Sequence, residues 1–162
     1  CKTNINQGAF MKSKIIGLLA ASLLWTSGAS GAQEHWTYGP VWECSAYQTN
    51  PGMFDTYIKW IRAHSEPINA EAKKQGLILD YKTFIHTRSN ENDHDVLFCT
   101  LHSSYGKALD YNKGDDDKGD AIAAAHWATA DEDKQTEMVK PRLEMRKYIS
   151  TSYHREVTLR PM

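Results

Sequence analysis

The chain has 162 residues, of which 41% are hydrophobic and 24% charged, with a formal net charge of −1. A chain of this size can build one hydrophobic core, and no change in composition marks a second domain. Its near-neutral balance and its lack of basic blocks exclude nucleic acid and anionic membrane surfaces as expected partners.

Residues 11–32 have the three parts of an export signal. Two lysines lie in residues 11–14, an apolar run at residues 15–25 is too short to span a bilayer, and small residues follow. This order predicts cleavage near Gly31-Ala32 or Ala32-Gln33. We expect residues 1–10 to be upstream non-native or untranslated-region sequence, 11–32 a signal peptide, and 33–162 one periplasmic or secreted domain without a membrane anchor.

Removal of the signal changes both the charge and the cysteine count. Residues 1–32 hold three lysines, no acidic residue and Cys1, so the remaining domain has a net charge of −4 and keeps Cys44 and Cys99. An oxidising compartment permits a disulfide between them. Both cysteines also lie in apolar strand patterns, where a free thiol packs as a small hydrophobe, so both interpretations stay open here.

The first half of the domain alternates strand and helix patterns. Residues 41–49 are rich in β-branched and aromatic residues and predict a strand, which the turn residues 50–52 end. Apolar residues then recur at helical spacing from Met53, and Pro67 predicts a kink or restart near Ser65. Gly76 supplies the chemistry of a helix end.

The second half repeats this order with a longer helical stretch. Residues 77–86 and 95–102 predict two strands joined by a polar loop. Helical patterns follow at 105–111 and 121–149, separated by the acidic residues 113–120, which we interpret as a flexible loop within an insertion at 113–134. The acidic run is similar to a calcium loop but lacks its ligand pattern. Residues 153–160 predict a last strand.

The order β-α-β-β-α-β predicts an α+β domain. Such a chain folds as a ferredoxin-like, four-stranded antiparallel sheet with helices on one face. Side chains alternate between the two faces of each strand. We expect the more apolar set to lie under the helices, and the mixed aromatic and ionisable set, which includes Glu43, Tyr47, Phe98 and His102, to lie on the open face.

Four segments carry a resemblance to a known superfamily. They are PGMFDTYIKWI at 51–61, AKKQGLILDYK at 72–82, DHDVLFCTL at 93–101 and REVTLRPM at 155–162. With them the chain resembles the dimeric α+β barrel superfamily, and most of all its small exported members of unassigned function. The resemblance implies a homodimer in which two open sheet faces enclose a cavity. It also makes the first and third strands neighbours, which places Cys44 and Cys99 on one face.

The mixed face carries the candidate site. Glu43, His102, His154 and Glu156 are the candidate catalytic residues, because a carboxylate can orient a histidine that acts as a general base. The alternative is that these residues pair with cations at a dimer seam. The candidate ligand-binding residues on this face are Tyr47, Phe84, His86, Phe98 and Arg160.

Two further histidines suggest cofactors without defining one. His94, between Asp93 and Asp95, can ligate a metal, but a solvated turn is the favoured interpretation and no metal site is predicted. His126 beside Trp127 is worth noting because some barrels of this architecture bind haem through a helix histidine. Packing is the alternative, and the sequence leaves the cofactor unknown.

Three functions therefore stand as hypotheses. The first is a homodimer whose cavity binds or transforms a small organic molecule, because mixed aromatic and polar linings are typical of ligand sites. The second is a non-catalytic envelope protein whose sheet face is only a dimer interface. The third is a haem or metal-binding barrel, and whether the chain is an enzyme stays undecided.

Overall fold

A computed structural model describes residues 35–162, so the predicted signal peptide lies outside the described residues. The four strands are β1 (Trp36–Thr49), β2 (Asp80–Ile85), β3 (Val96–His102) and β4 (Arg146–Leu159). The α-helices are α1 (Phe54–Trp60), α2 (Glu66–Lys74), α3 (Tyr105–Leu109), α4 (Lys113–Trp127), α5 (Glu132–Val139) and α6 (Pro141–Met145).

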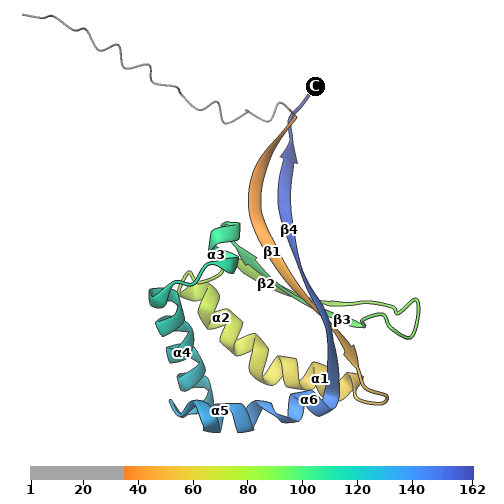
Figure 1. The fold of residues 1–162 in the computed structure, drawn as a ribbon, viewed down its shortest axis with the longest axis vertical. Coiled ribbons are helices and arrows are strands. Elements are labelled where there is room, and N and C mark those ends of the chain that lie inside the picture. The colour runs from red at the N-terminus through yellow and green to blue at the C-terminus, as the bar shows by residue number, and fades with distance from the viewer. Residues whose placement is uncertain (1–34) are drawn as a thin grey trace, which may run out of the picture. The chain divides into compact units, whose positions relative to one another are not determined.

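The four strands form one antiparallel sheet in the order β2-β3-β1-β4. The first strand therefore lies between the third and the fourth, and the α+β class with a four-stranded antiparallel sheet is confirmed. β1 and β4 are the long strands, and their outer ends, Trp36–Tyr38 and Val157–Leu159, pair only with each other (Figure 1).

The helices gather on one side of this sheet (Figure 1). The buried centre between the two layers is formed by Tyr57 and Ile61 from the first helical segment and Val96 from β3. Trp60 and Met145 pack around this centre from α1 and α6. Helices thus cover one face of the sheet, which we call the helix-covered face, and no helix of residues 35–162 covers the other, which we call the open face.

A π-helical turn at Ile61–Ser65 joins α1 to α2. Its cause lies four residues after Ala63: Pro67 has no N–H to donate to the Ala63 carbonyl, and its ring would clash with that carbonyl. The wider turn avoids the clash, and the Glu66 N–H bonds to the Ile61 carbonyl instead. The restart expected near Ser65 is therefore confirmed. α2 ends at Lys74, and Gly76 follows the C-cap residue Gln75 with a φ of 74°, which a side chain would disfavour.

The assignment of the two sheet faces is wrong for β1 and β3. Val96 and Tyr47 pack on helix residues, so their strand neighbours at every second position, which include Glu43, Phe98 and His102, lie on the helix-covered face. Trp42, Cys44, Leu97 and Cys99 face the other way. Alternation defines two sets of residues, but it does not say which set the helices cover. Here the mixed set packs against aromatic and arginine side chains of the helical layer.

The acidic run at 113–120 is a helix rather than the expected flexible loop. It forms the first half of α4, and the Asn112 side chain accepts a hydrogen bond from the Asp115 N–H as an N-cap. Asp115 and Asp116 lie in the first turn, where the helix dipole favours negative charge. Lys113 pairs with Asp117 one turn later. The capping chemistry therefore outweighs the two glycines of the run.

The last strand is longer than expected. β4 begins at Arg146 directly after α6, so residues 146–149, expected to be helical, belong to the sheet. Pairing with β1 at Thr49–Arg146 and Gln48–Lys147 imposes the extended conformation on helix-compatible residues.

Cys44 and Cys99 form a disulfide across the centre of the sheet. They are direct partners in the β1–β3 ladder, with their Cα atoms 4.1 Å apart, and both are almost fully buried. The bridge joins two strands 55 residues apart in sequence. It links β1 covalently to β3, which follows the first helices and β2 in the chain.

Removal of this bridge is expected to lower the free energy of unfolding by about 2 to 4 kcal/mol, because the unfolded chain regains the freedom that the closed loop removes. Urea unfolding of the wild type and of the Cys44→Ser/Cys99→Ser variant measures this difference. The wild type under reductant should match the variant. Equal stability of the oxidised and reduced wild type would contradict a structural role for the bridge.

Candidate functional site

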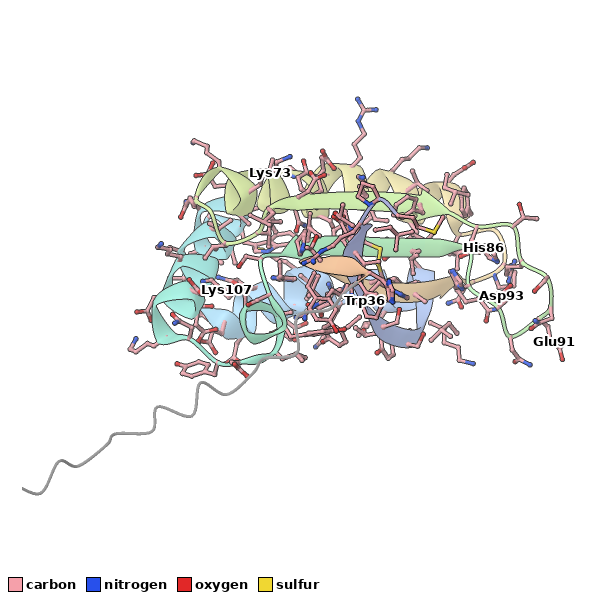
Figure 2. All side chains as sticks on the ribbon, turned by 90° about the horizontal axis from the view of Figure 1, so that it is seen from above. Trp36, Lys73, His86, Glu91, Asp93 and Lys107 are labelled. Atoms are coloured by element: carbon pink, nitrogen blue, oxygen red, sulfur yellow. A yellow bond between two sulfur atoms is a disulfide. The ribbon has the colours of Figure 1, made fainter. Side chains whose placement is uncertain are left out.

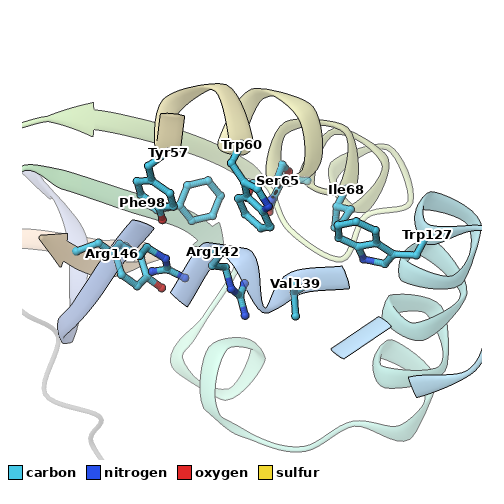
Figure 3. A pocket seen from close by; sticks show the side chains of 11 residues that line it. Tyr57, Trp60, Ser65, Ile68, Phe98, Trp127, Val139, Arg142 and Arg146 are labelled. Carbon is cyan, nitrogen blue, oxygen red and sulfur yellow. Dashed lines mark hydrogen bonds between the residues drawn. The ribbon is translucent and has the colours of Figure 1, made fainter. Parts of the chain in front are cut away.

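A cavity of about 340 Å³ lies between the sheet and the helices (Figure 3). Its sheet side is formed by Tyr47 of β1 and Phe98 of β3. Aromatic and aliphatic side chains from the helices close the other sides, together with two arginines. They are Tyr57, Trp60, Ile68, Trp127, Val139, Arg142 and Arg146. The cavity is therefore mostly apolar, with its positive charge at one end.

Arg146 lies where α6 ends and β4 begins, and its guanidinium packs on two tyrosine rings. Its Cζ atom is 3.3 Å from the centroid of Tyr47 and 5.1 Å from that of Tyr57. Asn50, in the turn after β1, holds this junction, because its N–H and side-chain amide donate to the carbonyls of Met145 and Glu144. The sheet and α6 thus position Arg146 together.

Arg142 lies one turn earlier on α6, with its Cζ atom 5.6 Å from the centroid of Trp60. Pro141 begins this helix after α5 ends, and the short α6 directs Arg142 into the cavity (Figure 3). Burial and the neighbouring positive charge of Arg146 lower the pKa of Arg142. Two like charges therefore share one partly apolar site.

Neither guanidinium is neutralised within the part of the chain that the structure describes. No carboxylate there pairs with Arg142 or Arg146. Nε of Arg142 and both Nε and Nη1 of Arg146 are buried without a hydrogen-bond acceptor. Because buried polar atoms of charged groups are costly without partners, this end of the cavity can accept an anion.

Tyr57 adds a neutral phenol to the same end. Burial raises its pKa to about 12, although the positive charge of Arg146 opposes the shift. The phenol stays protonated at neutral pH and can donate a hydrogen bond. The arginine end of the cavity thus offers several N–H and O–H donors beside aromatic faces, which is the combination that binds a carboxylate or phosphate on a planar body.

Two histidines lie beside the other end of the cavity. Nδ1 of His64 is 3.0 Å from Nε2 of His126, so one imidazole donates to the other. The ring of His64 stacks on Trp127 at 4.6 Å and lies 5.0 Å from Trp60. Nε2 of His126 is therefore occupied by its hydrogen bond with His64. The two histidines form one cluster with Trp60 and Trp127.

The four candidate catalytic residues divide into two pairs on opposite faces. Nε2 of His102 is 3.3 Å from a carboxylate oxygen of Glu43 on the helix-covered face, and Nδ1 of His102 is buried without a partner. On the open face, His154 is 2.8 Å from Ser152, and Glu156 accepts a hydrogen bond from the Trp42 indole. Only the first pair has the geometry of a carboxylate-oriented base.

The candidate ligand-binding residues are also separated. Tyr47 and Phe98 line the cavity, which is where the structure brings two of the five together. Phe84 is 46% exposed in β2, and His86 lies in the loop after β2. Arg160 follows β4 at the chain end, where its N–H bonds to the His35 carbonyl.

Sequence reasoning missed most of the cavity. The residues that it did not single out include Tyr57, Trp60, Arg142 and Arg146. Two spacings could have indicated them: Tyr57, Trp60 and His64 recur at helical intervals, and the two arginines are four residues apart after Pro141. Their convergence depends on how α1 and α6 meet over the sheet, which neither spacing specifies.

Comparisons with protein-family models, with curated proteins and with solved structures give no match for this chain. Within residues 35–162, no helix is both long and apolar enough to cross a membrane. The function must therefore be inferred from the geometry of the site.

Acidification is expected to destabilise the fold through His64. Burial, and then the charge of His126, lower the pKa of His64 in the folded state below its ordinary value of about 6.5. The unfolded chain then binds more protons below neutrality, so the free energy of unfolding falls as pH drops through about 6.5. Urea unfolding between about pH 8 and pH 5.5 measures this slope.

A histidine replacement isolates this effect. His64→Gln should make the slope shallower, whereas His154→Gln, which alters a histidine on the open face, should leave it unchanged. A slope that is identical in the wild type and His64→Gln would show that His64 does not carry the pH dependence.

Proposed function

We propose that this protein binds a small planar organic anion in the cavity between its sheet and its helices. The observation that carries the proposal is the pair of partly buried arginines, Arg142 and Arg146, which have buried nitrogens without acceptors, lack a carboxylate partner among the described residues and face an aromatic cavity. A carboxylate could bond to both guanidiniums and offset one of the two positive charges, and a doubly ionised phosphate would offset both. An aromatic body would then lie against Trp60 and Phe98.

The cavity size favours a small ligand. About 340 Å³ is at the lower end of the volumes typical of small-molecule pockets, so a ligand of one or two rings suits it. This site lies under the helices and not on the open face, where the barrel hypothesis places a cavity. The open-face candidates Phe84, His154 and Glu156 are therefore not part of this proposed site.

Binding can be tested with 2-naphthoate and its neutral analogue 2-naphthamide. The naphthoate is expected to quench tryptophan fluorescence saturably, since Trp60 and Trp127 line the cavity, and the amide to bind at least about tenfold more weakly because it brings no charge. Arg142→Gln should weaken naphthoate binding by about tenfold or more, since a charge-assisted hydrogen bond is worth about 1.5 to 3 kcal/mol.

Matched controls distinguish the site from general charge effects. Arg62→Gln removes an exposed arginine of the π-helical turn that does not line the cavity, and it should leave naphthoate binding unchanged. The melting temperature of each variant reports folding separately. Equal affinities for naphthoate and naphthamide, or for the wild type and Arg142→Gln, would reject the anion site.

We further propose that the fold is ferredoxin-like and that the protein forms a homodimer. The central position of β1, between β3 and β4, supports a split β-α-β arrangement. On the open face, Phe84 is 46% exposed beside its strand partner Leu97, the partly exposed Trp42 lies farther along the same face, and a second copy would cover this apolar surface. Native mass spectrometry should then record twice the chain mass, and Phe84→Glu should shift it to the single-chain mass.

We also propose that the domain works outside the cytoplasm. The buried Cys44–Cys99 disulfide supports this location, because such bridges persist in oxidising compartments.

A further inference from the structure

Three potential metal ligands meet at the base of the β2–β3 loop. His86 follows β2 directly, and Asp93 and His94 lie shortly before β3. Nε2 of His86 is 3.0 Å from Oδ2 of Asp93, and Nδ1 of His94 is 3.1 Å from Oδ1 of Asp93. The ligand atoms of all three residues lie within 4.8 Å of one another. Figure 2 shows His86 and Asp93 close together, with Glu91 farther out on the same loop.

The loop holds the carboxylate in place by its own hydrogen bonds. Oδ2 of Asp93 accepts from the Ser89 N–H at 3.0 Å and from the Ser89 hydroxyl at 2.8 Å. These bonds, together with the contact to His86, fix the orientation of the Asp93 carboxylate.

The sheet fixes the loop at both ends. The amide of Gln48, in β1, donates to the carbonyls of Glu91 and Asp93. The His86 N–H donates to the Asp95 carbonyl at 2.8 Å, and the buried Asp95 carboxylate accepts from the Thr49 N–H at 2.9 Å. These contacts between the loop and the sheet involve none of the ring nitrogens of His86 and His94.

A turn built on Asp93 does not require these rings. The bonds to Ser89 complete the turn, yet the two imidazoles also stack 4.5 Å apart with a ring nitrogen each against one carboxylate. Two imidazoles and a carboxylate form the ligand set of many zinc sites, and ligand atoms about 3 Å apart are within a small side-chain rotation of tetrahedral coordination.

We propose that His86, Asp93 and His94 bind one divalent transition-metal ion of the zinc type, with water completing its coordination. This site lies on the loop after β2 and does not involve the arginine-lined cavity. Metal binding and anion binding therefore succeed or fail independently.

The test uses the untagged full chain after treatment with a chelator. Calorimetric titration with Zn²⁺ should give one ion per chain, and His86→Ala, Asp93→Asn and His94→Ala should each weaken binding by at least about tenfold, because each removes a ligand of the ion. Co²⁺ offers a second readout, since four-coordinate Co²⁺ should produce visible absorption bands that the same variants lose. His154→Ala should change neither result.

Several outcomes would overturn the proposal. Undiminished Zn²⁺ binding in all three variants would show that the ion binds elsewhere, and loss of binding in His64→Ala would place it at the His64–His126 pair. No binding by the folded wild type at millimolar Zn²⁺ would remove the site altogether. Unchanged circular dichroism of the variants establishes that a loss of binding is not a loss of fold.

Discussion

The contact of Arg146 with Tyr47 and Tyr57 joins the two layers of this fold. Arg146 is the residue at which the chain leaves α6 and enters β4, while Tyr47 belongs to β1 and Tyr57 to α1. A guanidinium on an aromatic face stabilises a fold more where water is excluded, and Nε and Nη1 of Arg146 are buried. The same contact leaves much of the guanidinium without hydrogen-bond acceptors, so the interaction that joins the layers also creates the positive end of the cavity.

Two prolines prepare the cavity from the helix side. Pro67 is responsible for the π-helical turn, whose last residue, Ser65, lines the cavity together with Ile68 of α2, and Pro141 begins the short helix that carries Arg142. Tertiary packing over the sheet then brings these segments together with Trp127 at the end of α4. Each of these elements can be explained from its local sequence, whereas the site depends on how the ends of these elements meet.

Strand order and element type could be predicted from the sequence because they depend on local pattern and on topology. The direct Cys44–Cys99 pairing followed from neighbouring strands once the register was known. Which face of the sheet the helices cover could not be predicted. Tyr47 and Phe98 alternate with apolar residues and could lie on either face, and only the packing of Tyr57 and Arg146 against this side shows that it is the covered one. In the same way, the first half of α4 was interpreted as a loop because glycine and aspartate have low helix propensity, whereas Asn112 and the helix dipole stabilise its first turn.

The alternation on β1 also explains why Glu43 and His102 do not meet His154 and Glu156. Glu43 and His154 lie on adjacent strands, but Trp42 is the direct partner of His154, so the two candidates point to opposite faces. A shift of one residue in register would have brought all four together. The register is set by side-chain packing and by the β-bulges of the β1–β4 ladder, which a single sequence does not reveal.

The central claim is that two partly buried arginines, Arg142 and Arg146, receive an organic anion. The most direct measurement is ¹⁵N NMR of the arginine side-chain Nε–H groups while 2-naphthoate is added to the protein. The account predicts that the Nε resonances of Arg142 and Arg146 shift together and saturate, while that of Arg62 stays in place. Unchanged resonances of Arg142 and Arg146 at saturating naphthoate, or equal shifts with the neutral amide, would contradict it.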